Sequence, residues 1–268
     1  MSLRLRNKLK TLAEEGRAGF VPFFSVGDPD LETSRDAILA AAESGADVIE
    51  LGVPFSDPIA DGTVVQESSQ RALAAGSSLP RVLEMVGWLR ARTDVPFVLF
   101  GYYNPYFRYG EQAFARDARA SGADAVLVTD LPPEEAAPMV EACRANDLAN
   151  IFLLAPTSTP ARMQAVAEMA SGFVYMVSVT GVTGARSNAP AGIESLVASA
   201  RKITGLPIGV GFGISTPAQA GEVARYADLV VVGSALVRHM FDAGRSGAVA
   251  AVREFVTDLR RGIDAVRR

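Results

Sequence analysis

The chain has 268 residues, of which 49% are hydrophobic and 21% are charged, and its formal net charge is −4 at pH 7. This length and composition fit one large domain, so we expect residues 1–268 to form a single domain. Lysine and arginine are scattered without basic runs, which argues against a nucleic-acid partner. No apolar run approaches the roughly 20 residues of a membrane span, so we expect no membrane partner either.

The single cysteine and the N-terminal residues indicate the compartment. Cys143 has no second cysteine with which to form an internal disulfide, and residues 1–16 lack the apolar core of a signal peptide. We therefore expect a cytoplasmic protein. Cys143 follows Met139 and Val140 at helical spacing, which predicts a buried helix position and not a nucleophile.

Beyond an amphipathic opening helix, the chain repeats one unit, a short apolar run followed by an amphipathic run. We expect strands at residues 19–28, 47–53, 95–103, 123–130, 150–158, 173–181, 206–215 and 227–236. Two helices, at 63–76 and 79–93, follow the second strand, and one helix, at 105–122, follows the third. Such a series in about 250 residues predicts a (β/α)₈ TIM barrel with extra helices. An open doubly wound sheet is the alternative.

A glutamate stands inside the second expected strand, in the stretch DVIELGVPFSDPIADG from Asp47 to Gly62. Strand alternation places Glu50 on the face opposite Ile49 and Leu51. The strand is apolar on both faces, and an ionised carboxylate there costs several kcal/mol unless it is compensated. Two hypotheses stay open: a structural glutamate tied to arginine or backbone amides, and a general acid/base with a raised pKa.

A second carboxylate, Asp61, follows the loop after the same strand. One strand and its C-terminal loop could therefore deliver two acids to one mouth of the barrel. The alternative is that Asp61 caps the helix that begins after it, which is the commoner role of an aspartate in this position. A functional role for Asp61 thus depends on the role of Glu50.

Three glycine-rich loops follow the sixth, seventh and eighth strands, at the end of the barrel where such enzymes build their sites. The loop at 181–192 is typical of a mobile lid, although an ordinary surface loop has the same composition. The loops at 209–215 and 231–236 place glycines where backbone amides approach a ligand. Taken together, the three loops predict a phosphate site that involves Gly184, Gly213, Gly233 and Ser234.

The residue types that are scarce narrow the chemistry. His239 is the only histidine, so zinc and iron have almost no ligands and no metal site is expected, whereas an oxygen-ligated Mg²⁺ stays open. Lys8, Lys10 and Lys202 fall in or near helices away from the expected strand C-termini, which removes a Schiff-base nucleophile. Catalysis by carboxylates remains.

Five segments, IELGVPFSDPIADGTVVQ, YYNPYFRYG, SVTGVTGAR, VGFGIS and VVGSALV, resemble the tryptophan synthase α subunit family, in the family's order and across nearly the whole chain. The resemblance implies a (β/α)₈ barrel that cleaves indole-3-glycerol phosphate to indole and glyceraldehyde 3-phosphate in tryptophan biosynthesis. It implies no cofactor in this chain, and a β subunit that carries pyridoxal phosphate in an α₂β₂ tetramer. A free-standing indole-3-glycerol-phosphate lyase without a β partner is the alternative.

The same resemblance implies roles for individual residues. Glu50 matches the family's general acid/base and Asp61 matches the carboxylate that holds the indole nitrogen, so both are expected to be catalytic. The residues expected to bind substrate are Tyr175 beside the glutamate, Phe212, Phe100, Val65 and Thr129 around the indole ring, Gly184, Gly213, Gly233 and Ser234 around the phosphate, and Thr183, which meets Asp61 when the lid closes.

Overall fold

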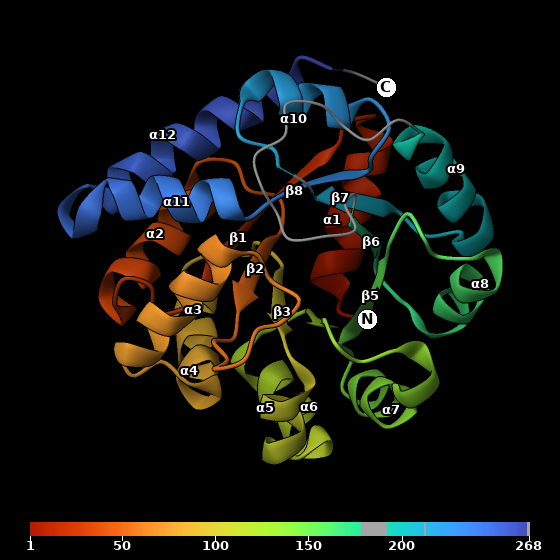
Figure 1. Ribbon diagram of the computed structural model, residues 1–268, viewed down its shortest axis with the longest axis horizontal. Coiled ribbons are helices and arrows are strands. Elements are labelled where there is room, and N and C mark those ends of the chain that lie inside the picture. Colours follow the sequence, from red (N-terminus) through yellow and green to blue (C-terminus); the bar gives the residue numbers. More distant parts are fainter. Residues whose placement is uncertain (178–191, 212, 267–268) are drawn as a thin grey trace.

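The computed structural model describes residues 1–177, 192–211 and 213–266, which form a closed barrel of eight parallel strands surrounded by helices (Figure 1). The strands are β1 (Gly19–Ser25), β2 (Ile49–Gly52), β3 (Phe97–Gly101), β4 (Ala125–Val128), β5 (Ala149–Leu154), β6 (Val174–Val177), β7 (Ile208–Gly211) and β8 (Leu229–Val232). Each strand pairs with its neighbours in chain order, and β8 pairs with β1. The predicted barrel is confirmed and the open sheet is wrong.

The helices lie outside the strands, except that α1 covers one end of the barrel. They are α1 (Leu3–Glu14), α2 (Leu31–Glu43), α3 (Thr63–Ala74), α4 (Leu79–Arg90), α5 (Tyr103–Tyr109), α6 (Glu111–Ser121), the 3₁₀ turn η1 (Pro133–Glu135), α7 (Ala137–Ala145), α8 (Pro160–Met169), α9 (Ile193–Thr204), α10 (Pro217–Ala224), α11 (Ser234–Asp242) and α12 (Gly244–Asp264). None of these helices is long and apolar enough to cross a membrane.

One predicted helix, residues 105–122, is wrong in its bounds. The structure has two helices there, α5 and α6, and they meet at Gly110. Gly110 has a φ of 89°, a left-handed conformation that interrupts a right-handed helix and that glycine adopts without a steric penalty.

Strand alternation separates two apolar clusters. Val48 of β2 and Val98 of β3 belong to a cluster inside the barrel, which side chains of α1 also join. Ile49 and Leu51 belong to the larger cluster between the strands and the helices. Glu50 shares the parity of Val48, so its side chain faces the barrel interior, as the alternation of the sequence predicts.

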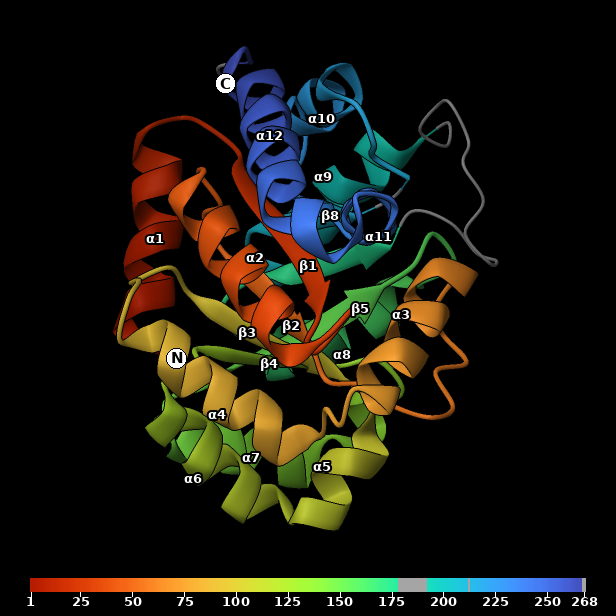
Figure 2. The ribbon, with the colours of Figure 1, turned by 90° about the vertical axis from the view of Figure 1, so that its left-hand side faces the viewer.

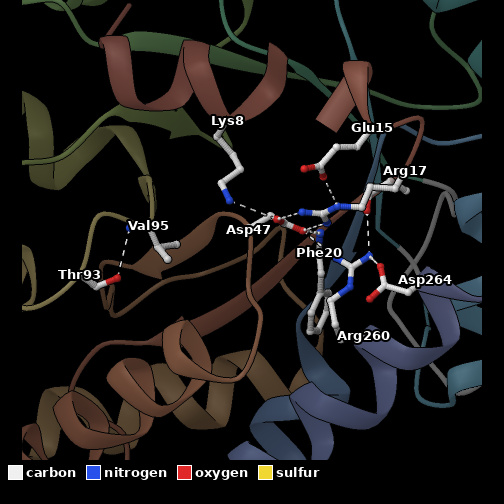
Figure 3. A network of polar contacts seen from close by, with 10 residues as sticks. Lys8, Glu15, Arg17, Phe20, Asp47, Thr93, Val95, Arg260 and Asp264 are labelled. Carbon is white, nitrogen blue, oxygen red and sulfur yellow. Dashed lines mark hydrogen bonds and ion pairs between the residues drawn. The ribbon is translucent and has the colours of Figure 1, made fainter. Parts of the chain in front are cut away.

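Charged networks stabilise the amino-terminal end of the barrel, where α1 lies. Figure 2 shows α1 on one side of the strands and α3 on the other. Asp47, just before β2, pairs with Lys8 at 3.3 Å, Arg17 at 2.9 Å and Arg260 at 2.7 Å, and it accepts a hydrogen bond from the amide of Phe20 at 3.0 Å (Figure 3). These contacts join α1, β1, β2 and α12.

The same device recurs before other even-numbered strands. Asp124, before β4, accepts a hydrogen bond from the amide of Phe97 at 2.9 Å. Asp228, before β8, accepts one from the amide of Ile208 at 2.8 Å. In each case an aspartate links the start of one strand to the start of the preceding strand, so this end of the barrel has a structural role.

Candidate active site

Glu50 is a buried carboxyl group. Its side chain, on β2, is in register with Phe23 of β1 and Val98 of β3. The residue is 1% exposed, and within the described part of the chain its Oε1 has no hydrogen-bond partner. Burial raises the pKa of Glu50 to about 8, so the group is mostly protonated at neutral pH. These observations do not fit a glutamate tied to arginine or to backbone amides.

Asp61 lies at the end of the loop after β2, and its carboxylate has one defined partner. The hydroxyl of Tyr102 donates a hydrogen bond to Oδ2 of Asp61 at 3.0 Å, and the same hydroxyl accepts one from the amide of Ala60 at 3.0 Å. Burial raises the pKa of Asp61 to about 6, while the hydrogen bond from Tyr102 opposes this rise. Asp61 is therefore mostly ionised at pH 7.

The cap of α3 separates the two interpretations of Asp61. The N-cap residue is Gly62, and no side chain caps the helix there. The carboxylate of Asp61 instead contacts Tyr102. The helix-cap hypothesis for Asp61 is therefore wrong, and the carboxylate is available to a ligand.

Tyr175, on β6, belongs to the interior side of the barrel together with Phe100. Burial raises the pKa of Tyr175 well above its usual value, and the nearby charges of Glu50 and Asp61 raise it further. The phenol is thus neutral and lies near both carboxyl groups. Gly211 leaves room for it, because a Cβ atom at Gly211 would lie 2.1 Å from the Tyr175 hydroxyl oxygen.

A small pocket opens at the carboxyl ends of β1 to β3. Its lining includes three residues that the sequence analysis assigned to the substrate, Asp61, Val65 and Phe100. Phe100 meets Phe23 edge to face, with the ring centroids 5.2 Å apart. One carboxylate among aromatic and aliphatic walls suits a flat apolar ligand that carries one polar N–H group.

Thr129 does not line this pocket. It follows β4, where its hydroxyl donates a hydrogen bond to the carbonyl of Gly101 at 3.2 Å and also contacts the Tyr102 hydroxyl. Its contacts are therefore with the residues that hold Asp61. Sequence reasoning missed Tyr102 as a functional residue, since its only sequence signal was a tyrosine at the C-terminal end of an expected strand.

Two of the glycines assigned to phosphate, Gly213 and Gly233, lie just after strands β7 and β8. Gly233 follows β8 and precedes Ser234, the first residue of α11. A Cβ atom at Gly233 would lie 3.7 Å from Phe23, an ordinary contact, so packing alone does not require glycine there. Gly213 has a φ of 38°, in the region that favours glycine.

Part of the expected site lies outside the described residues. This applies to Thr183, Gly184 and Phe212, and to the lid expected at 181–192 apart from its last residue. Among the residues that are described, no group of three or more His, Cys, Asp or Glu side chains is arranged to hold a metal ion.

Comparisons with known proteins agree on one family. A family model described as "Tryptophan synthase alpha chain" matches residues 9–263. Proteins named tryptophan synthase alpha chain from Citrifermentans bemidjiense and Geobacter sulfurreducens are 51% and 52% identical to the chain; the alignments cover 97% of this chain and 97% and 98% of the respective relatives. A crystal structure of the alpha subunit from Legionella pneumophila superposes with a TM-score of 0.92 at 33% identity and covers 99% of this chain and 100% of that one. A Mycobacterium tuberculosis tryptophan synthase structure has a TM-score of 0.90 at 37% identity, with 98% and 99% covered.

Proposed function

The chain belongs to the tryptophan synthase alpha chain family, and we propose that Glu50 and Asp61 carry out the reaction of that family in it. The reaction is the retro-aldol cleavage of indole-3-glycerol phosphate to indole and glyceraldehyde 3-phosphate, which makes the chain a carbon–carbon lyase of tryptophan biosynthesis. The observation that carries the residue assignment is the buried carboxyl of Glu50, which faces the barrel interior and whose Oε1 has no hydrogen-bond partner among the described residues.

The different protonation states of the two carboxyl groups suit the two demands of the cleavage. Protonated Glu50 donates its proton to C3 of the indole ring, which places a positive charge on the ring nitrogen. Ionised Asp61 stabilises that charge. Glu50, now a carboxylate in an apolar environment, takes the proton of the C3′ hydroxyl. The bond between C3 and C3′ then breaks, its electron pair returns to the indole ring, and the aldehyde forms.

The substrate therefore acts as its own electron sink. A metal or lysine aldolase needs an external sink to accept the electrons of the breaking bond, whereas here the protonated indole ring accepts them. We propose that this chain needs no cofactor for the reaction, and that pyridoxal phosphate belongs to its partner.

The remaining residues bind the two ends of the substrate, the indole ring and the phosphate. Phe100, Val65 and Tyr175 surround the indole ring, and Thr129 supports this side through Tyr102. The phosphate is held by backbone amides at Gly213 and Gly233 and by Ser234, because the N-terminus of α11 offers unpaired N–H groups and the positive end of the helix dipole. Thr183, Gly184 and Phe212 complete the site in this proposal.

The loop at 54–60 is the proposed contact with a β subunit, in an α₂β₂ tetramer in the cytoplasm. Ile59 is 86% exposed and Phe107, on the neighbouring α5, is 63% exposed, so apolar side chains face outward there. Phe55 stacks on Tyr102, with the ring centroids 5.3 Å apart, and Tyr102 holds Asp61. A partner that docks on this loop would thus act on the catalytic carboxylate.

The test is to incubate the purified chain with indole-3-glycerol phosphate, with and without a β subunit, and to follow indole release. We expect slow release from the chain alone and faster release with the partner. No indole in either reaction would contradict the proposed function. Release that no β subunit accelerates would favour the free-standing lyase.

A further inference from the structure

The loop after β1 is tied to α3 by a buried ion pair. Asp28 is 1% exposed, and its two carboxylate oxygens accept hydrogen bonds from Arg71 Nε at 2.7 Å and Arg71 Nη2 at 2.8 Å. The hydroxyl of Ser68 donates a third bond to Asp28 at 2.6 Å. Such a two-point arginine–carboxylate contact fixes orientation as well as distance. Hydrogen bonding to Asp28 raises the pKa of Arg71, so the guanidinium remains charged.

Two other polar side chains of α3, Gln66 and Ser69, hold the loop that ends in Asp61. The amide nitrogen of the Gln66 side chain donates a hydrogen bond to the backbone carbonyl of Asp61 at 2.8 Å. Ser69 accepts a hydrogen bond from the amide of Phe55 at 2.9 Å, and its hydroxyl donates one to the carbonyl of Phe55 at 3.0 Å. Since α3 has no side-chain cap at its N-terminus, these contacts and the pair at Asp28 set its position.

Arg71 also reaches the helix on the phosphate side of the site. Its guanidinium carbon lies 4.3 Å from the centroid of the Phe241 ring of α11, a cation–π geometry. Helices α3 and α11 pack side by side (Figure 1). Arg71, which lies on the helix that follows Asp61, thus also contacts the helix that begins at Ser234.

We propose that Asp28 and Arg71 form a clamp that fixes Asp61, which binds the indole end of the substrate, relative to the start of α11, which binds the phosphate end. Both are positioning residues, because neither lines the pocket. The inference rests on the proposed function. A substrate that is bound at both ends requires a constant distance between the two sets of binding groups. A misplacement of roughly 1 Å can lower the rate about a hundredfold.

The location of the Asp28–Arg71 pair favours a role in positioning the site over a role in stability alone. In the described part of the chain three aspartates are buried: Asp28, Asp47 and Asp124. Asp47 and Asp124 precede β2 and β4, at the amino-terminal end, where α1 covers the barrel. Asp28 follows β1, at the carboxyl end, where the site lies. The ion pairs of Asp47 and Asp124 have no catalytic neighbour among the described residues. Asp28, in contrast, acts on α3, the helix that holds Asp61.

The test compares two arginine variants in the full chain. Arg71→Met removes the contact with Asp28 and keeps an apolar stem against Phe241. Arg90→Met is the matched control, because Arg90 pairs with buried Asp124 at 3.0 Å at the opposite end of the barrel. We measure Tm, and kcat and KM for indole-3-glycerol phosphate. Arg71→Met is expected to lower kcat by about 10- to 100-fold with KM within about threefold, and Arg90→Met is expected to lower Tm while kcat stays within about twofold.

A third variant, Arg71→Lys, keeps the positive charge but replaces the bidentate guanidinium with a single ammonium group. It should therefore recover part of the kcat that Arg71→Met loses. It also provides the comparison if Arg71→Met does not fold. Equal kcat for the Arg71 variants and wild type, or a kcat that follows Tm equally in the Arg71 and Arg90 variants, would overturn the clamp. An inactive wild type would instead overturn the proposed function, so the two failures are distinguishable.

Discussion

At the level of single residues, Glu50 and Asp61 have the same functional group but different surroundings. Glu50 is buried, its Oε1 has no hydrogen-bond partner in the described part of the chain, and its pKa rises to about 8. Asp61 accepts a hydrogen bond from Tyr102, and its pKa rises only to about 6. At pH 7 one group therefore holds a proton and the other is mostly ionised, which is the division between acid and charge stabiliser that the cleavage needs.

Asp61→Asn tests the role of the negative charge. Asparagine keeps the shape of the side chain and can still accept a hydrogen bond from Tyr102, but it cannot neutralise a charge on the indole nitrogen. We expect kcat for indole release to fall at least about a hundredfold, with little change in Tm. A variant with near-normal kcat would show that Asp61 has no electrostatic role.

Tyr102→Phe tests the hydrogen bond that opposes the rise in the pKa of Asp61. In the wild type, kcat/KM should rise with pH as Asp61 ionises near pH 6 and fall as Glu50 loses its proton near pH 8. Because the tyrosine bond lowers the pKa of Asp61, its loss should move the acid limb to higher pH and leave the basic limb in place. The measurement is kcat/KM as a function of pH for both proteins. An acid limb at the same pH in both, or at lower pH in the variant, would argue against this account.

The raised pKa of Glu50 also predicts how stability depends on pH. The folded state binds the proton of Glu50 more tightly than the unfolded state, in which the pKa of the glutamate is near its ordinary value of 4.5. The favourable contribution is therefore complete below pH 4.5 and is lost as pH rises through about 8. The difference in the free energy of unfolding between Glu50→Gln and wild type should grow in favour of the variant from pH 5 to pH 9. Urea titrations at several pH values measure it, and a difference that is constant with pH would contradict the assigned pKa.

At the level of elements, two glycines at strand ends should respond differently to the same change. Gly211→Ala places a Cβ atom 2.1 Å from the hydroxyl oxygen of Tyr175, so it should lower Tm and displace that tyrosine. Gly233→Ala meets only an ordinary contact with Phe23, so Tm should change little. If the backbone at Gly233 holds phosphate, this variant should raise KM for indole-3-glycerol phosphate and leave the binding of indole unaffected. Equal weakening of both ligands would indicate a packing defect instead.

The elements also show what the sequence could predict. The barrel and the placement of Glu50 opposite Ile49 and Leu51 follow from periodicity, because both depend on neighbours in the chain. Which of the two faces is the barrel interior is given by the fold. The break at Gly110 depended on a single backbone angle that the helical pattern of its neighbours concealed. The contact between Asp28 and Arg71 joins residues 43 positions apart, so no local pattern predicts it. The aspartates before β2, β4 and β8 share a pattern that is visible in the sequence, because each follows an alanine at the start of an apolar run.

At the level of the whole molecule, the two ends of the barrel have separate tasks. The amino-terminal end carries charge networks such as that of Asp47, which stabilise the fold (Figure 3). The carboxyl end carries Glu50, whose Oε1 has no hydrogen-bond partner among the described residues, a pocket and exposed apolar residues such as Ile59. This division allows the site to contain a group that lowers stability while the opposite end compensates for it.

The most direct test of the central claim is the rate of indole release from indole-3-glycerol phosphate by wild type and by Glu50→Gln at pH 7, each with a saturating β subunit. Glutamine keeps the size and polarity of the side chain but cannot transfer a proton. The account predicts that kcat falls at least about a hundredfold while substrate binding is retained. A Glu50→Gln variant that releases indole at nearly the wild-type rate would contradict it.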